Sequence, residues 1–294
     1  MTQDIVERSG GDELFALLQR ALPQQVLSRG MHALARSRRP AIRNAILRTV
    51  LRAYPQINLA EAVQPDPFAY ESFNAFFTRA LKPTARPVHT GANVAVSPVD
   101  GTVSQLGRTD AGKLVQAKGM DYTCDGLLAD TASAARYLGG SFACIYLAPY
   151  NYHRIHMPLE GVLRATRYVP GHLFSVNAST ARTVPQLFAR NERVVCDFDT
   201  ELGPMCMVLV GALFVGSIET VFAGEINPPP GRGGQVRAVE AGVGRRFARG
   251  EELGRFNMGS TVIVLFGNPA AFEPRMQPGA AVCMGEAFAR FGAA

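Results

Sequence analysis

The hydrophobic pattern of this chain changes once, close to Pro65 and Pro67. Before these prolines, apolar residues recur at helical spacing; after them, short apolar and β-branched runs alternate with turn residues. The runs that we interpret as strands are 93–96, 114–117, 142–147, 162–169, 193–198, 205–215, 236–239 and 262–266, with a short helix near 131–137. The pattern predicts an α+β fold, with N-terminal amphipathic helices in residues 1–65 and a β-rich domain in residues 66–294.

The N-terminal region contains two predicted helices. Asp12 can cap the first, which ends at Pro23, and the second begins at Pro40 and ends before Pro55. In the second helix an apolar arc faces a polar and basic one: Ile42, Ile46, Thr49, Val50 and Ala53 against Asn44, Arg48 and Arg52.

The positive charge of the chain is concentrated in this helical region. The net charge is +6, and residues 14–60 contain eight arginines and no acidic residue. A basic amphipathic helix is typical of proteins that lie on an anionic membrane surface. The alternative is a helix packed on the protein's own core with its arginines in water. Nucleic acid is not expected as a partner, because no aromatic residues interleave with the arginines.

No segment predicts a transmembrane helix or a secretory signal. The first 13 residues are acidic and polar, and the most apolar uncharged segment, 202–218, has only 17 residues and reads as buried strands. The five cysteines form no Cys-x-x-Cys pair. We therefore expect buried thiols, no disulfide framework and no metal site.

A Gly259-Ser260 step lies directly before the last strongly apolar run. Glycine permits a tight bend on which the serine hydroxyl can reach the preceding carbonyl. Attack on the Gly259 carbonyl would give an ester, and elimination and hydrolysis would leave a pyruvoyl ketone on residue 260. The alternative is an ordinary turn that enters a buried strand.

Two other motifs contain residues suited to acid-base chemistry. Asp100, which precedes a glycine, is either a turn residue or a group that orients a histidine. His153 and His156 are either two structural histidines or two with separate acid-base tasks. Residues three apart on a strand face opposite sides, which disfavours a shared metal ion. His172 is interpreted as structural.

Four motifs, in this order and at these separations, resemble the phosphatidylserine decarboxylase family: residues 97–103, 152–158, 170–177 and 256–266. The resemblance extends from about Phe73 to Phe266, while the N-terminal helices match only in character. Where the family usually has Leu-Gly-Ser-Thr, this chain has Met at position 258 and keeps the Gly-Ser bond.

The resemblance implies a self-processing, pyruvoyl-dependent proenzyme of phospholipid synthesis that converts phosphatidylserine to phosphatidylethanolamine. Cleavage between Gly259 and Ser260 would give a β chain, 1–259, and an α chain, 260–294, that begins with the pyruvoyl group. The substrate amine would form a Schiff base with this group, which acts as an electron sink. Pyridoxal phosphate, the alternative sink, normally needs a lysine, and no lysine here has the context of a cofactor site: Lys82, Lys113 and Lys118.

The resemblance also implies roles for single residues. Asp100 and His156 match the residues that activate Ser260 for cleavage, with the logic of a hydrolase triad. His153 matches the histidine of the decarboxylation step and is expected to donate a proton. The substrate pocket is expected to include Phe174 and Ser175.

The implied partners are phosphatidylserine, an anionic membrane surface and a second processed unit in a homodimer. The implied location is peripheral, on the cytoplasmic face of the cell membrane. Two alternatives remain at this point. One is a membrane-bound serine hydrolase with Asp100, His156 and Ser260, although the sequence lacks a Gly-x-Ser-x-Gly elbow. The other is a non-catalytic lipid-binding protein of the same fold.

Overall fold

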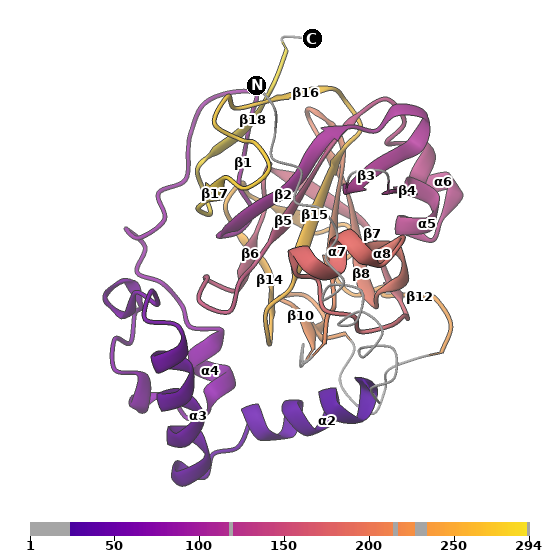
Figure 1. Ribbon diagram of the computed structural model, residues 1–294. Helices are drawn as coiled ribbons and strands as arrows, with labels where there is room; N and C mark the ends of the chain where they lie inside the picture. Colours follow the sequence, from indigo (N-terminus) through magenta and orange to yellow (C-terminus); the bar gives the residue numbers. More distant parts are fainter. Residues whose placement is uncertain (1–23, 118–119, 214–216, 227–233, 293–294) are drawn as a thin grey trace.

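A nine-stranded antiparallel sheet forms the centre of the computed structural model, which describes residues 24–117, 120–213, 217–226 and 234–292 (Figure 1). The strand order is β12-β7-β8-β9-β15-β5-β2-β17, and β13 also pairs with β7. The strands are β2 (Gly101–Arg108), β5 (Ser141–Tyr146), β7 (Gly161–Val169), β8 (Arg193–Thr200), β9 (Gly203–Val210), β12 (Arg237–Ala238), β13 (Arg246–Phe247), β15 (Thr261–Phe266) and β17 (Ala281–Val282).

Strand β15 is apolar from Val262 onward because both faces of the sheet are covered. Val262 and Val264 belong to one core cluster, whereas Ile263 and Leu265 belong to another. The second cluster also contains side chains of four short helices: α5 (Cys124–Leu128), α6 (Thr131–Ala135), α7 (Ala178–Thr183) and α8 (Leu187–Arg190). A strand buried on both faces loses the polar alternation of a half-exposed strand.

Two smaller antiparallel sheets cover the opposite face, with orders β11-β10-β14-β6 and β1-β18-β16. Their inward side chains, such as Ile155, Phe256 and Phe288, join the cluster that contains Val262. A separate hairpin is formed by β3 and β4. The strands are β1 (Val94–Val96), β3 (Lys113–Ala117), β4 (Met120–Thr123), β6 (Arg154–His156), β10 (Ile218–Thr220), β11 (Gly224–Glu225), β14 (Glu252–Phe256), β16 (Ala270–Phe272) and β18 (Ala287–Phe291).

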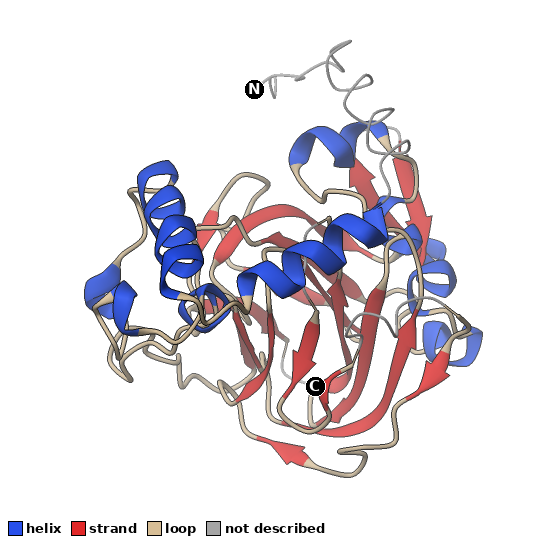
Figure 2. Cartoon of the chain, turned by 90° about the horizontal axis from the view of Figure 1, so that it is seen from below, coloured by secondary structure: helices blue, strands red, loops and turns tan. Residues whose placement is uncertain are grey.

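The N-terminal helices lie at the end of the β body where β14 is followed by β15 (Figure 1). They are α2 (Gln24–Ala35), α3 (Pro40–Ala53) and α4 (Phe73–Phe77), with 3-10 turns at Leu59–Glu61 and Pro67–Ala69. Figure 2 shows α2 running across this end of the strands. Helix α4 begins where the Ser72 hydroxyl accepts a hydrogen bond from the Ala75 N–H at 3.1 Å. Among the described residues, no helix combines the length and apolarity needed to cross a bilayer.

The α+β class, the helix that begins at Pro40 and most of the predicted strands are confirmed. The apolar arc of α3 was misplaced: Leu47 is fully buried, while Thr49 and Ala53 are exposed. Leu47 packs with the α4 phenylalanines, so contact with α4 determines which face is buried. The helix expected after Asp12 lies outside the described residues.

Three other expectations differ from the structure. The strand expected at 205–215 ends at Val210. Strand β2 was not predicted, because its polar residues and two glycines are not typical of a strand. Its pairing with β5 stabilises it instead. Four cysteines are buried, but Cys283 is exposed.

Candidate active site

The Gly259-Ser260 bond lies where the chain passes from β14 in a small sheet to β15 in the large sheet. The Ser260 carbonyl accepts a hydrogen bond from the Leu147 N–H at 2.8 Å. Gly259 does not adopt a positive φ, so the expected need for unusual backbone angles is not found. Space is the constraint instead: a Cβ on Gly259 would lie 3.2 Å from the Leu147 carbonyl oxygen and 3.3 Å from His153 Nε2.

Three buried polar atoms near this bond have no hydrogen-bond partner among the described residues: Ser260 Oγ, Thr261 Oγ1 and His153 Nε2. All three side chains are fully buried. Buried polar groups without partners are rare because each forfeits its hydration. Their concentration at one peptide bond indicates a place where chemistry, rather than stability, selects the residues.

His153 presents an unprotonated nitrogen to this bond. Its Nδ1 lies 2.8 Å from the Asn151 carbonyl oxygen, so the neutral ring carries its proton on Nδ1 and a lone pair on Nε2. The Phe77 ring packs on the imidazole with a centroid separation of 4.0 Å. Burial, assisted by the positive charge of Arg79, lowers the pKa of His153 to about 3. The histidine beside Gly259 is therefore neutral at physiological pH.

His156 has both ring nitrogens in hydrogen bonds. Nδ1 lies 2.8 Å from the Gly250 carbonyl oxygen, and Nε2 lies 3.1 Å from the Tyr152 hydroxyl. Burial lowers its pKa; the hydrogen bond to Gly250, the charge of Glu252 and, to a smaller extent, the charge of Asp100 oppose this change. Asp100 is therefore close enough to act on His156 electrostatically.

The Asp100 carboxylate is itself held by Arg86. Arg86 Nε donates to Oδ1 at 2.8 Å, and Nη2 donates to Oδ2 at 2.5 Å. Oδ1 also accepts the Met284 N–H at 2.8 Å. Neither Asp100 nor Ser260 is hydrogen-bonded to His156 in the described part of the chain. The structure thus brings Asp100 near His156, but the histidine that it places at the Gly259-Ser260 bond is His153.

The predicted pocket residues lie on the other side of Met258. Phe174 is buried, and its backbone N–H and C=O pair with the Asn191 side chain at 3.2 and 2.8 Å. Ser175 is half-buried, and His172 is exposed and stacks on the Phe174 ring at 5.0 Å. Met258 packs against the cluster of Phe174 and also against the cluster of the α4 phenylalanines. This packing connects the pocket motif to the N-terminal helices.

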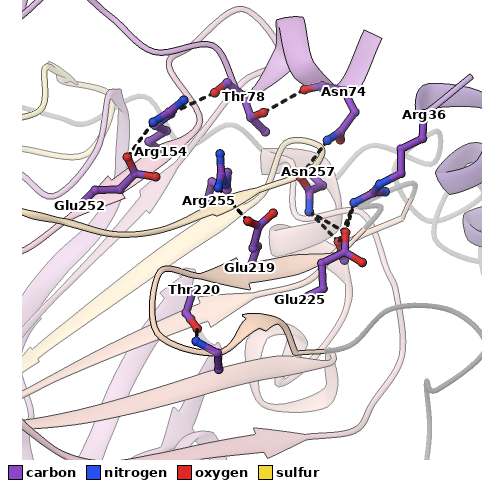
Figure 3. A network of polar contacts seen from close by, with 12 residues as sticks. Arg36, Asn74, Thr78, Arg154, Glu219, Thr220, Glu225, Glu252, Arg255 and Asn257 are labelled. Atoms are coloured by element: carbon purple, nitrogen blue, oxygen red, sulfur yellow. Dashed lines mark hydrogen bonds and ion pairs between the residues drawn. The ribbon is translucent and has the colours of Figure 1, made fainter. Parts of the chain in front are cut away.

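A polar network fixes the residue before Met258 (Figure 3). Asn257 Nδ2 donates to Ser217 Oγ at 2.6 Å, and its Oδ1 accepts from Asn74 Nδ2 at 3.0 Å. The Glu225 carboxylate accepts from Ser217 Oγ at 2.8 Å and forms an ion pair with Arg36. Helix α4 and Arg36, the residue directly after α2, are thereby both joined to the segment that leads to Ser260.

The sequence did not single out several residues that build this site. Tyr152 stood inside a motif, but its contact with His156 depends on the fold. No sequence pattern indicated that Arg86 pairs with Asp100. None indicated that Asn257 is the centre of a polar network. Each of these three roles depends on the folded structure rather than on a local sequence pattern.

One sterically crowded peptide bond is flanked by a neutral buried histidine and by a serine hydroxyl without a hydrogen-bond partner among the described residues. These are features of an enzyme rather than of a binding module. Comparison with known proteins agrees. A family model described as phosphatidylserine decarboxylase matches residues 73–290, and a second, described as PSD, matches residues 14–55. The chain belongs to the phosphatidylserine decarboxylase family of enzymes.

Individual relatives are similar over nearly their whole length. A protein of Shewanella sp. (strain MR-4) is 53% identical over 285 residues, which cover 95% of this chain and 97% of the relative. One of Azotobacter vinelandii is 52% identical over 258 residues, or 87% of this chain and 90% of the relative. Both are named phosphatidylserine decarboxylase proenzyme.

Proposed function

We propose that this chain is a proenzyme that converts phosphatidylserine to phosphatidylethanolamine with a pyruvoyl group made from its own Ser260. The observation that carries the proposal is the buried Ser260 hydroxyl, which follows Gly259 beside Nε2 of His153; neither atom has a hydrogen-bond partner in the part of the chain that the structure describes. A hydroxyl without a partner is available to react with the adjacent carbonyl. The names of the relatives support the same substrate and a cleaved precursor.

Self-cleavage in this proposal uses only atoms of the chain and one water. The Ser260 hydroxyl oxygen attacks the Gly259 carbonyl carbon, and the acyl group moves from nitrogen to oxygen. Loss of the Ser260 α-proton then releases Gly259 as a carboxylate. Water displaces the remaining nitrogen as ammonia and leaves a ketone at residue 260. The products are a β chain, 1–259, and an α chain, 260–294.

We assign activation of Ser260 to Asp100 and His156, as the family resemblance implies. Burial lowers the pKa of His156, while the hydrogen bond to Gly250, the Glu252 charge and, to a smaller extent, the Asp100 charge raise it and so favour proton uptake by the imidazole. In the uncleaved chain the Tyr152 hydroxyl occupies His156 Nε2. The role therefore requires Tyr152 to give up this hydrogen bond during cleavage.

We assign the decarboxylation step to His153. The pyruvoyl ketone supplies an electron sink for the electrons released with carbon dioxide. His153 Nε2 lies beside residue 259, where it can hold or transfer a proton at the substrate carbon. The Phe77 ring covers the imidazole and excludes water from it. Phe174 and Ser175 complete the pocket in this proposal.

We further propose that residues 1–65 dock on an anionic membrane and that residues 66–294 form the decarboxylase domain. The helices α2 and α3 lie at the end of the β body where β14 is followed by β15 (Figure 1), and the Gly259-Ser260 bond joins these two strands, which supports headgroup entry from a bilayer. The location is then peripheral, on the cytoplasmic face of the cell membrane.

Processed units are proposed to form a homodimer. A molar mass from light scattering that corresponds to one processed unit would contradict this oligomeric state.

A pair of histidine variants tests the assigned roles. His153→Asn should self-cleave yet lose nearly all formation of phosphatidylethanolamine, because its proton carrier is gone. His156→Asn should remain largely uncleaved, as should the control Ser260→Ala. Cleavage is followed on denaturing gels, and product by release of carbon dioxide from carboxyl-labelled phosphatidylserine.

The reverse pattern would overturn the assignment. If His153→Asn stays whole while His156→Asn cleaves at the normal rate, the histidine nearest the bond is the base for cleavage. If cleaved wild-type protein releases no carbon dioxide from phosphatidylserine, the proposed activity is wrong.

A further inference from the structure

Arg79 is a buried cation without a bonded partner. Only 5% of the residue is exposed, and its Nε is a buried donor with no acceptor. Within the described residues, its guanidinium takes part in no hydrogen bond and no ion pair. The guanidinium stacks on the Phe76 ring, whose centroid lies 5.3 Å from the guanidinium carbon. Burial lowers the pKa of Arg79, which expresses the cost of this environment.

Two other arginines of this chain, one buried and one partly buried, show how a structural arginine is satisfied. Arg193 is 2% exposed and donates to four backbone carbonyls, those of Leu127, Ala189, Asn191 and Gly126. Arg86 pairs with Asp100 and Glu61. An unpaired buried charge is strongly unfavourable, so Arg79 lacks a partner that the functional protein is expected to supply.

The position of Arg79 connects it to the candidate active site. It lies two residues after Phe77, whose ring packs on His153. Its charge is close enough to act on His153, where it adds to the effect of burial. Three groups of the chain could oppose its charge: burial raises the pKa of Tyr70, which keeps that phenol neutral, and the carboxylates of Asp100 and Glu61 are already paired with Arg86. The missing partner is therefore an anion that enters the site from outside.

We propose that Arg79 is a substrate-binding residue whose ligand is the phosphodiester group of the phosphatidylserine headgroup. This inference rests on the proposed function. A planar guanidinium matches two phosphate oxygens with two parallel hydrogen bonds. The phosphodiester keeps its negative charge throughout the reaction, so its binding anchors the headgroup without opposing the chemistry.

The other anion of the headgroup fits Arg79 less well. The carboxylate must leave as neutral carbon dioxide, and a guanidinium bound to it would stabilise the ground state more than the transition state. The carboxylate of Gly259, which self-cleavage creates, is a third anion. The two rival anions predict different results for the same variants.

Steady-state kinetics of Arg79→Gln and Arg79→Lys provide the first test. Arg79→Gln should self-cleave normally and raise KM for phosphatidylserine in mixed micelles by about tenfold or more, with a smaller change in kcat. Arg79→Lys keeps the positive charge but lacks the planar guanidinium that can donate two parallel hydrogen bonds. Its KM should lie between those of the wild-type protein and Arg79→Gln. The matched control is Arg237→Gln, because Arg237 also stacks on an aromatic ring, that of Tyr168 at 4.7 Å, but is exposed.

Calorimetry of ligand binding provides a readout that does not depend on turnover. The probes are glycerophosphoserine, which has the phosphodiester, and O-acetylserine, which has the amine and carboxylate without phosphate. Wild-type protein should bind glycerophosphoserine more tightly, and Arg79→Gln should remove this preference.

Each contrary result overturns the inference in a recognisable way. Equal weakening of both probes would assign Arg79 to the carboxylate. An unchanged KM with a lower melting temperature of the cleaved protein would assign it to Gly259. An unchanged KM with only a shifted pH profile would assign it to His153. If wild-type protein binds the probes as expected but does not turn over phosphatidylserine, the proposed function is contradicted. The inference that Arg79 binds the phosphodiester is not.

Discussion

His153 and His156 are close in sequence but chemically different in the fold. Both have Nδ1 within 2.8 Å of a backbone carbonyl, so both neutral rings leave Nε2 unprotonated. Tyr152 bonds the Nε2 of His156, whereas the Nε2 of His153 has no partner among the described residues. The distinction between an engaged and a free lone pair supports the separate tasks that we propose for them.

The buried neutral state of His153 predicts a pH dependence of stability. An unfolded histidine takes up a proton near pH 6.5, but the folded one does so only at a pKa of about 3. Between these values the unfolded state binds more protons, so the free energy of unfolding falls as the pH falls through this window. The loss is at most about 5 kcal/mol.

Urea unfolding between pH 7 and pH 4 measures this effect. Ser260→Ala provides an uncleaved background, and Ser260→Ala/His153→Asn should lose clearly less stability over the same range. Asparagine can still donate to the Asn151 carbonyl, which preserves the structural bond of Nδ1. Parallel pH curves for the two proteins would show that His153 is not held neutral by the fold.

The sequence pointed to Ser260, Asp100 and both histidines, because their motifs are local. It could not reveal that Arg86 holds Asp100 or that Gly259 is constrained by space rather than by backbone angles. These facts depend on which distant segments the fold brings together. For the same reason, Arg79 carried no sequence signal as a buried unpaired cation.

Among the elements, β15 was readable from sequence and β2 was not. The run from Thr261 to Phe266 is buried on both faces, so its sequence is the apolar run that is typical of a buried strand. Strand β2 is half-buried, and its backbone pairing with β5 fixes it more than its side chains do. The helix α3 was predicted correctly at its ends, since prolines mark them, but its buried face depends on contact with α4.

Helix α3 carries the test of membrane docking. Arg48 and Arg52 are exposed on it, and each arginine near an anionic surface contributes about 1 kcal/mol. Arg48→Gln/Arg52→Gln should therefore weaken binding to vesicles with anionic lipid by about 2 kcal/mol, roughly 30-fold. Co-sedimentation at low and high salt measures this loss.

A second double variant controls for net charge. Arg245→Gln/Arg246→Gln removes the same charge from the β body, where these arginines pair with Glu251 and Glu160. It should bind vesicles almost as well as wild-type protein. An equal loss for both double variants would show that the overall charge, rather than the helix, attracts the membrane.

At the scale of the whole molecule, the proposed cleavage would divide the core without separating it. The piece 260–294 contains β15, which pairs along its length with β5 and β9 of the larger piece. The same piece supplies β17 and β18, which pair with β2 and β1. Both pieces are therefore expected to remain together under native conditions and to separate only when the protein is denatured.

Denaturing mass spectrometry of the purified chain tests self-processing at Ser260 most directly. It should find two pieces, 1–259 and 260–294, with the smaller one lighter by the mass of ammonia than a piece that begins with serine. The smaller piece should also lack a free N-terminal amine. A single intact chain with an ordinary Ser260, in protein that is active on phosphatidylserine, would contradict the account.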